Sequence, residues 1–428
     1  MTLPPPNSLP NGADGRLGRW AWWLCASRAA VSLSFMIYAG SLPALGIAWA
    51  MSDAEAGLVQ SVFNFAYALS LVAAGWLSDR LGARRVFLWS SACTALAGIM
   101  VAGLARSFES GLVLFALFGL FHGGTYTPSI MLIAQGVPSA RRGLAIGMLL
   151  AGASLGYAGS IAIASAATAF ASYREAFVVC AIAPAAAFLF AKTGTRGRPN
   201  LIVRRHASVD LPKGQSDRHA SILLTLGYTA HCWELLGMWA WMPAFLLSAL
   251  AASSAAGQLV LGVWIGIAIH LSGCLSAFTM GHASDRFGRR TVLVLLGILG
   301  AASSLAIGWL EQAPAALLLA FAALYGFTAL GDSPVLSTAM TETVAPRSLG
   351  SALALRSILG FGAGGLSPLV FGAVRDATPP DFGWIAAFSV LGAGGLAAAL
   401  CAMLLRGRRR RSSAFTGRRE GELTCGED

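Results

Sequence analysis

The sequence is poor in charge. Lys, Arg, Asp and Glu make up 11% of its 428 residues, whereas apolar residues make up 56%; soluble domains carry about 25% charged residues. So little charge excludes a soluble multidomain enzyme, a disordered chain and a coiled coil. Twelve spans of roughly 20–25 apolar residues would take about 270 residues and leave enough for short loops and two tails. The composition predicts an integral membrane protein.

The sequence also lacks CxxC pairs. Six of its seven cysteines lie in apolar surroundings, as buried small hydrophobic residues do, which argues against a disulfide framework and a metal site. The first 19 residues contain no short apolar core followed by a small-residue cleavage site. We therefore expect the first apolar segment to be retained as a span, not removed as a signal peptide. We expect neither a metal nor a cofactor.

Apolar runs separated by polar residues predict twelve spans. They lie at about 22–50, 57–77, 86–105, 109–134, 144–168, 173–191, 221–249, 258–280, 291–310, 314–340, 350–373 and 382–405. One long polar stretch divides them six and six. The predicted organisation is a disordered cytoplasmic N-terminus (1–21), a six-helix bundle (22–191), a cytoplasmic linker (192–220), a second six-helix bundle (221–405) and a basic cytoplasmic tail (406–428).

Basic residues are distributed very unequally over this arrangement. With both termini inside, 25 of the 30 Lys and Arg residues fall in inside segments, three in outside loops and two, Arg28 and Arg356, within spans. Because basic loops stay in the cytoplasm, we expect a multi-pass protein of a bacterial inner membrane with cytoplasmic termini. The arginine run after the last span is typical of an anchor to anionic lipid, so we expect no nucleic-acid partner.

The two halves of the sequence repeat one another at an offset of 206–207 residues. The segment GWLSDRLGAR (75–84) corresponds to GHASDRFGRR (281–290), and three glycines at 119, 124 and 143 correspond to those at 326, 331 and 350. Two similar halves joined by a linker are one of the parallel-repeat layouts of secondary transporters.

The pair of G-x-x-x-D-R-x-G-x-R loops after spans 2 and 8 resembles the signature of the major facilitator superfamily, and the span count and linker position agree with it. The resemblance implies an all-α membrane fold of two six-helix bundles that rock about a central site to carry a solute, coupled to protons or another gradient. It implies no particular substrate.

The resemblance further implies a cytoplasmic latch that stabilises the outward-open state. A carboxylate at the end of span 2 would accept hydrogen bonds from the start of a neighbouring helix, whose dipole favours negative charge. The glycines would make tight turns and the arginines would anchor the loops. The latch residues would be Gly75, Asp79, Arg80, Gly82, Arg84, Gly281, Asp285, Arg286, Gly288 and Arg290.

Ionisable residues inside spans are candidates for function, because a charge at mid-membrane costs roughly 2.5–3.5 kcal/mol. Glu234 lies halfway along span 7, and His231, three residues earlier, shares its helix face. Neighbouring tryptophans provide apolar surroundings that favour a protonated carboxyl. We expect Glu234 to carry the coupling proton or to contact the substrate; the alternative is a hydrogen-bonded structural glutamate.

Two further charges lie within the last spans. Asp332, beside Pro334 in span 10, and Arg356, two turns into span 11, are expected to form a buried pair, either structural or broken during transport. Arg28, near the start of span 1, either borders the site or extends its charged group to the inner interface.

Polar residues at helical spacing mark the inner faces of several spans. The candidates for the cavity are Tyr38 in span 1, Asn64 in span 2, and His122 and Tyr126 in span 4. His270 in span 8 is equivalent to Asn64 by the repeat, and it is either a ligand or a hydrogen-bonding group between helices. In the superfamily, spans 1, 4, 7 and 10 line the central cavity.

We therefore expect a monomeric secondary transporter, not an enzyme, that moves a small polar or weakly acidic organic solute with protons. The alternative is a proton-driven efflux pump for amphipathic compounds, which the tryptophans of span 7 favour. Two motifs that the superfamily's proton-coupled and antiport members often carry are absent: Phe115 stands where span 4 would have an arginine, and span 5 lacks a G-P-x-x-G-G pattern. The sequence leaves the direction of transport open.

Overall fold

The computed structural model describes residues 18–202, 217–250 and 254–405. Most of the predicted N-terminal segment, the middle of the linker and the basic tail lie outside the described residues. Within them the chain forms helices and no strand, which confirms an all-α fold. The first half contains α1 (Arg19–Ser32), α2 (Ile37–Ala48), α3 (Asp53–Leu81), α4 (Ala83–Leu104), α5 (Phe108–Gly123), α6 (Tyr126–Gly136), α7 (Ser139–Phe170) and α8 (Tyr173–Gly194).

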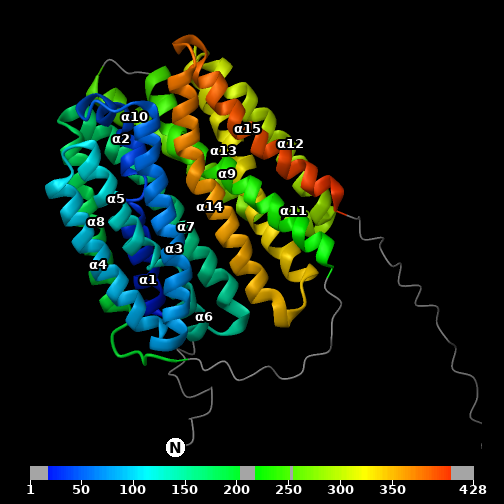
Figure 1. The fold of residues 1–428 in the computed structure, drawn as a ribbon. Coiled ribbons are helices and arrows are strands. Elements are labelled where there is room, and N and C mark those ends of the chain that lie inside the picture. Colours follow the sequence, from blue (N-terminus) through cyan, green and yellow to red (C-terminus); the bar gives the residue numbers. More distant parts are fainter. Residues whose placement is uncertain (1–17, 203–216, 251–253, 406–428) are drawn as a thin grey trace, which may run out of the picture.

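The second half repeats this arrangement beside the first (Figure 1). It contains α9 (Arg218–Ala249), α10 (Ala255–Gly266), the π-helical turn η1 (Ile267–Leu271), α11 (Ser272–Phe287), α12 (Arg289–Ile307), the 3₁₀ turn η2 (Gly308–Leu310), α13 (Ala315–Thr343), α14 (Pro346–Ala377) and α15 (Pro380–Leu404). We refer to α1–α8 as the first half and to α9–α15 as the second half.

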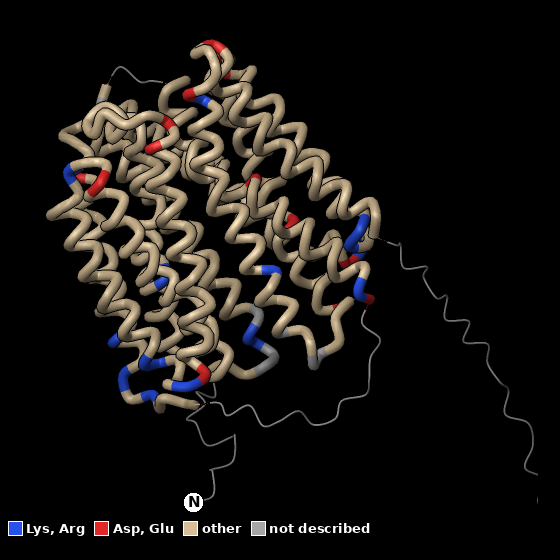
Figure 2. Tube along the Cα trace, viewed as in Figure 1, with Lys and Arg blue, Asp and Glu red and all other residues tan. Residues whose placement is uncertain are grey.

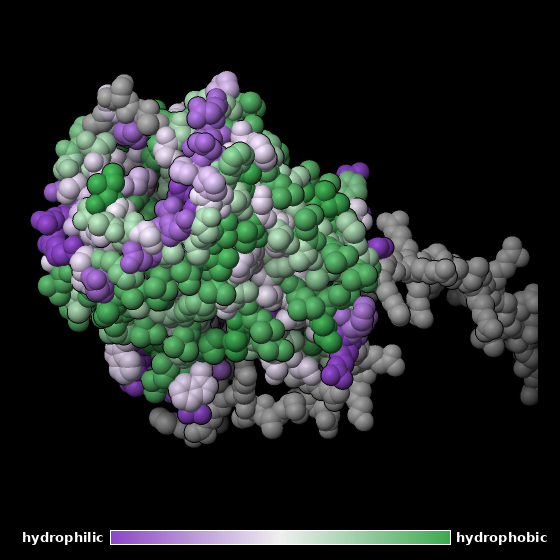
Figure 3. Space-filling model, turned by 45° about the horizontal axis from the view of Figure 1, so that its top comes forward, coloured by the Kyte–Doolittle hydropathy of each residue, from purple (hydrophilic) through white to green (hydrophobic). Residues whose placement is uncertain are grey.

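Eleven stretches in the described part of the chain are long and apolar enough to cross a membrane. The remaining predicted span is α9, which is 32 residues long but is not among these eleven. Its sequence carries two histidines and Glu234. Apolar side chains cover much of the molecular surface (Figure 3), as expected where lipid replaces water.

Two predicted spans of the first half are interrupted. Between α1 and α2, the N–H of Met36 donates to Oγ of Ser160 on α7 (3.0 Å), which satisfies a backbone group outside a regular helix. Between α5 and α6, Gly123 and Gly124 sit so close to neighbouring helices that an added Cβ would lie 2.4 Å from the carbonyl oxygen of Tyr67 or from Oγ of Ser90. Both interruptions are absent from the sequence prediction, which gave continuous spans.

Basic residues gather toward one end of the molecule (Figure 2), which we call the arginine-rich end. It carries the two signature loops, 75–84 and 281–290, with Arg80, Arg84, Arg85, Arg286, Arg289 and Arg290. We call the other end the opposite end; there α3 begins and α14 ends.

The halves are in close contact at the opposite end. The carboxylate of Asp376, in the last turn of α14, accepts hydrogen bonds from the first N–H groups of α3, those of Asp53 (3.0 Å) and Ala54 (2.8 Å). Arg375 forms an ion pair with Asp53 at 3.0 Å. A helix N-terminus favours a carboxylate in this position, so the α14 end caps α3 and closes the molecule here.

Candidate functional site

A cavity of about 830 Å³ lies between the two halves, within the range of small-molecule sites. Residues of α1, α3, α6 and α7 line it from the first half, and residues of α9, α11, α13 and α14 from the second. It includes Gly75, one of the signature glycines, on the side of the arginine-rich end. The cavity is therefore accessible from the end at which the halves are not joined by the Asp376 contacts.

Arg28 borders this cavity from α1. Its side chain is 3% exposed, its Nη2 donates to the hydroxyl of Tyr157 (3.2 Å), and its Cζ lies 4.9 Å from the ring centroid of Tyr126. Nε and Nη1 have no hydrogen-bond partner among the described residues. Of the two roles that the sequence left open, the structure therefore places Arg28 at the cavity and not at the interface.

Arg356 borders the cavity from α14, in the second half. Its Nη2 donates to Oγ of Ser337 (3.2 Å), and its Cζ lies 4.1 Å from the ring centroid of Tyr228. As with Arg28, Nε and Nη1 lack a hydrogen-bond partner within the described chain. The predicted ion pair with Asp332 is wrong for this state, because Asp332 is engaged elsewhere.

Asp332 contacts His231 instead. Nδ1 of His231 lies 2.8 Å from Oδ1 of Asp332, and Nε2 lies 2.9 Å from Oγ of Ser333. His231 and Asp332 are 2% and 7% exposed. Because His231 and Ser333 line the cavity and Asp332 does not, the imidazole separates this carboxylate from the cavity.

Glu234 points away from the cavity into the interior of the second half. Its carboxylate oxygens lie against α12 and α15, where an added Cβ on Gly300 or Gly395 would be 3.4 or 2.8 Å from them. These two glycines make room for the side chain. Glu234 is on the same helix as His231 and also interacts with Tyr325 of α13, but only His231 lines the cavity, so the structure does not bring the two side chains together there.

The remaining cavity candidates divide into two groups. Asn64 and Tyr126 line the cavity, whereas Tyr38 donates its hydroxyl proton to the carbonyl of Ala56 (2.9 Å). His122 and His270 are buried in aromatic clusters. His122 lies among Phe35, Phe63, Tyr67 and Phe118, and His270 contacts Tyr157 and Trp239. Neither histidine lines the cavity, so their rings support the aromatic side chains that do.

Three aromatic residues of the lining, Phe35, Tyr157 and Trp239, were not among the candidates predicted from the sequence. Phe35, Tyr67, Tyr157 and Trp239 form a connected set of rings along the cavity, with neighbouring centroids 4.8–6.4 Å apart. The available signal was weak, because aromatic residues are common throughout membrane helices.

The signature loops have the geometry that their glycines require. Gly82 and Gly288 follow α3 and α11 with φ of +87° and +90°, a region that glycine tolerates best. The loop arginines contact their own halves. Two of them donate to backbone carbonyls: Arg84 to that of Thr195 (3.0 Å) and Arg290 to that of Met403 (2.7 Å). Two lie over aromatic rings: Arg80 over Trp76 and Arg286 over Phe287. Asp285 forms an ion pair with Arg289. Asp79 occupies the last turn of α3, as Asp285 does in α11, and Gly281 faces open space.

A family model described as "Major Facilitator Superfamily" matches residues 24–270 and 224–425. The chain belongs to the Major Facilitator Superfamily. This confirms the resemblance based on the signature loops, and it identifies the chain as a solute transporter of the membrane.

Curated relatives of this superfamily member are also transporters. One from Cupriavidus pinatubonensis, named a probable 4-methylmuconolactone transporter, is 30% identical over 358 residues, which cover 80% of this chain and 81% of that protein. Another from Cupriavidus necator, named the probable sulfoacetate transporter SauU, is 25% identical and covers 81% and 85%.

Solved structures support the superfamily fold. The nucleoside transporter NupG, as its D323A mutant, has a TM-score of 0.72 at 15% identity, covering 90% of this chain and 98% of that one. A bacterial homologue of the human lysosomal transporter Spinster, inward-facing and unoccupied, has a TM-score of 0.66 at 17% identity, covering 91% and 96%. At these identities the likeness concerns the fold alone.

Proposed function

We propose that this protein carries small organic anions whose body contacts the aromatic side chains of the cavity. The charge of the central cavity carries the proposal: Arg28 and Arg356 border it, one from each half, and none of its described lining residues is Asp or Glu. Each guanidinium group has two nitrogen atoms without a hydrogen-bond partner in the described chain. Such groups bind the paired oxygens of carboxylates and sulfonates.

The body of the anion would lie against the aromatic side chains near Arg28. Rings contribute apolar area and contact unsaturated ligands edge-on or face-on. The names of the two Cupriavidus relatives support an organic anion. The alternative function predicted from the sequence is efflux of amphipathic compounds. For cationic compounds it is disfavoured by the two arginines, which have no acidic neighbours in the described lining.

Binding to the purified protein tests this function. We expect 4-methylmuconolactone, sulfoacetate or benzoate to raise the melting temperature, whereas tetraphenylphosphonium, an apolar cation, leaves it unchanged at the same ionic strength. A ligand at 100 times its Kd adds about 2.7 kcal/mol to the free energy of unfolding. Stabilisation by the cation alone would contradict the proposal.

We further propose that the arginine-rich end faces the cytoplasm of a bacterium, since basic loops remain inside, and that transport is coupled to protons. A single chain contains the whole cavity, so a monomer suffices. In this orientation the described state is open inward, and rocking of the halves would break the contacts of Asp376 with α3 while bringing the signature loops toward the other half.

The signature aspartate gives one prediction for this rocking. If the carboxylate of Asp79 latches the inner side in the outward-open state, Asp79→Asn removes its charge and shifts the population toward the inward-open state. Labelling of Cys274, which lines the cavity, by an impermeant maleimide in inside-out vesicles should then increase. Asp285→Asn is the matched variant in the second loop, where the carboxylate pairs with Arg289 in its own half. Unchanged labelling in Asp79→Asn would reduce Asp79 to an anchor.

A further inference from the structure

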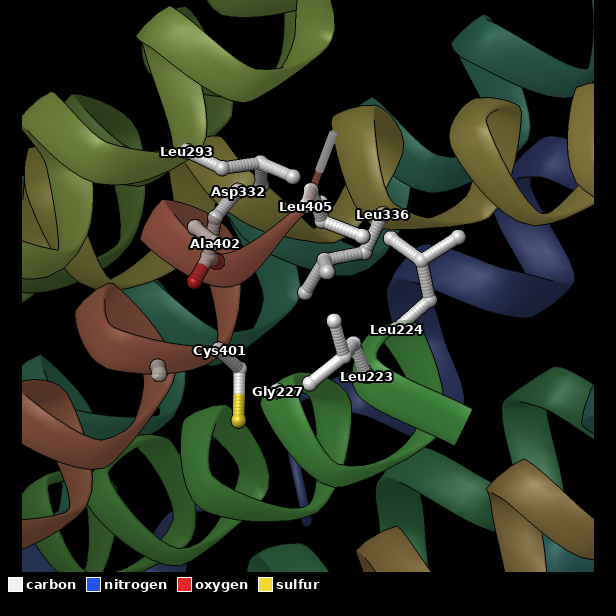
Figure 4. A pocket seen from close by; sticks show the side chains of 10 residues that line it. Leu223, Leu224, Gly227, Leu293, Asp332, Leu336, Cys401, Ala402 and Leu405 are labelled. Carbon is white, nitrogen blue, oxygen red and sulfur yellow. The ribbon is translucent and has the colours of Figure 1, made fainter. Parts of the chain in front are cut away.

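The contact between His231 and Asp332 connects two separate spaces. On one side, His231 and Ser333 border the central cavity. On the other, Asp332 borders a narrow pocket of about 10 Å³ between α9, α12, α13 and α15 (Figure 4). That volume is about what one water molecule needs.

The narrow pocket lies on the side of Asp332 that faces the arginine-rich end. Its lining includes Leu223 in the second turn of α9, Leu293 in the second turn of α12 and Leu405 just after α15. These helix ends flank the second signature loop and the linker. A water in the pocket would therefore be on a route from Asp332 to the arginine-rich end that does not pass through the substrate cavity.

We propose that the coupling proton binds at the His231–Asp332 pair and reaches the arginine-rich end through this pocket. The inference rests on the proposed function, because it assigns the proton site of the same anion carrier. It replaces the expectation that Glu234 carries this proton, since Glu234 contacts α12 and α15 in the interior of the second half and does not border the cavity.

The proton transfer involves no other reactant. In the neutral imidazole of His231 the proton is on Nδ1, which lies 2.8 Å from Oδ1 of Asp332, and a proton from water in the cavity binds Nε2, beside Ser333 Oγ. The neutral imidazole becomes an imidazolium ion paired with the carboxylate. Loss of the Nδ1 proton to Asp332, and from Asp332 to a water in the narrow pocket, restores the neutral imidazole with its proton on Nε2. Reorientation of the imidazole ring, which carries the Nε2 proton to the side of Asp332, then resets the pair.

Anion and proton binding favour one another in this arrangement. The unprotonated pair carries one negative charge behind the His231 ring that lines the cavity, and protonation makes the pair neutral. An anion held by Arg356 is repelled less by a neutral wall, and by linkage the bound anion promotes protonation. Tyr228 contacts both groups: its ring centroid lies 4.1 Å from Cζ of Arg356 and 5.7 Å from the ring centroid of His231. Symport of the anion with a proton follows.

The other titratable groups around the pair come from three helices. They are Tyr228, Cys232 and Glu234 on α9, Arg356 on α14 and Cys401 on α15. From α11 and α12, Ser276, Leu293 and Leu296 face the Gly331–Asp332 segment and do not titrate. Arg356 is the only cation in this set of described residues, so its occupation by an anion changes the field at the pair most.

The order Ser333–His231–Asp332 also resembles a hydrolytic triad. Acyl transfer needs backbone N–H groups that stabilise the oxyanion, often including the N–H of the residue after the nucleophile. The residue after Ser333 is Pro334, which has no N–H, and both lie inside α13. The geometry therefore points to proton binding and not to hydrolysis.

Proteoliposomes test the proposal. The probes are 4-methylmuconolactone and sulfoacetate, and a pH-sensitive dye reports proton movement. We expect Asp332→Asn to keep probe exchange between the two sides, while proton movement driven by a probe gradient falls about tenfold or more, within the usual range of coupling between sites. Proton movement should fall likewise in His231→Gln. In Asp332→Asn, probe affinity should also lose its dependence on pH, because the wall charge no longer changes.

A separate variant tests the proposed proton route through the narrow pocket. An added Cβ on Gly227 would lie 3.5 Å from Cβ of Cys401, an ordinary contact, so Gly227→Ala places a methyl group in the pocket without a clash. We expect this variant to slow proton movement several-fold and to leave probe binding unchanged. Gly46→Ala, with no neighbour within 4 Å, is the control.

The outcomes separate the two proposals. If wild-type protein exchanges neither these probes nor another organic anion, the proposed function fails. If it exchanges a probe but moves no proton, or if Asp332→Asn moves protons normally while Glu234→Gln does not, the anion carrier stands and the inferred proton site is wrong.

Discussion

Arg28→Gln is expected to weaken binding of organic anions by about a hundredfold. The variant removes a buried cation that would bind the anion, and breaking such a charge-assisted contact costs about 3 kcal/mol, which corresponds to about two powers of ten in Kd. Calorimetric titration with 4-methylmuconolactone or sulfoacetate measures the change. Arg28→Lys should recover part of the affinity, because it keeps the charge but loses the planar pair of N–H donors.

Two further variants test whether the loss of anion binding in Arg28→Gln is specific to the arginines of the cavity. Arg356→Gln should weaken binding to a similar extent, because the second half contributes the second cation. Arg174→Gln is the control, since Arg174 is exposed near the start of α8 and is absent from the cavity lining. Equal affinity in wild type and Arg28→Gln, with both proteins folded by circular dichroism, would remove the basis for an anion site.

Gly372→Ala is expected to trap the protein open at the opposite end. In the described state a Cβ at residue 372 would lie 2.0 Å from the carbonyl oxygen of Asp53, which belongs to the other half. The halves can relieve this clash by separating at that end. Overpacking of about 2 kcal/mol shifts the equilibrium between the two states about thirtyfold. With the six other cysteines replaced by Ser, labelling of Cys274 from the arginine-rich side should fall and transport should be lost.

The chain provides matched glycine controls for this prediction. Gly98 is equally close to a backbone oxygen, with its added Cβ 1.7 Å from the carbonyl oxygen of Cys180, but α4 and α8 belong to the same half. Rocking cannot relieve that clash, so Gly98→Ala should lower the melting temperature instead of changing the labelling. Gly103→Ala, which meets nothing within 4 Å, should change neither. Normal transport and labelling in Gly372→Ala would show that the halves do not need this close approach.

From the sequence, the polar residues that are buried within the spans could be predicted better than the side chains that they contact. Arg356, His231, Asn64 and Tyr126 were candidates for the cavity and line it in the structure, because polar residues in apolar spans avoid lipid. Glu234 met the same criterion, but small residues on α12 and α15 create a second polar interior that only the packing of the helices reveals. The polarity of a residue in a span predicts that its side chain is buried. Which helices that side chain contacts depends on the rotation of its own helix in the bundle, which the sequence does not give.

The depth of two residues in their spans was also not enough to predict whether they form an ion pair. Asp332 and Arg356 were predicted to pair because they lie on adjacent spans near the same end. The structure instead has His231 of α9 beside Asp332, at 2.8 Å. Spans that are far apart in sequence can be neighbours in a bundle, and the order of the helices around the cavity cannot be obtained from one sequence.

The π-helical turn at 267–271 has a consequence for the history of the two halves. Gly57 and Gly262 each pack a helix of one half against the other half and are 205 positions apart, whereas Gly82 and Gly288 are 206 apart. In the second half, the π turn lies between Gly262 and Gly288. The matching stretch of the first half, between Gly57 and Gly82, is an uninterrupted α-helix. One residue inserted into a duplicated helix after the two copies diverged accounts for the difference, because a π turn absorbs an extra residue without lengthening a loop. His270 lies in this turn and contacts Tyr157 and Trp239.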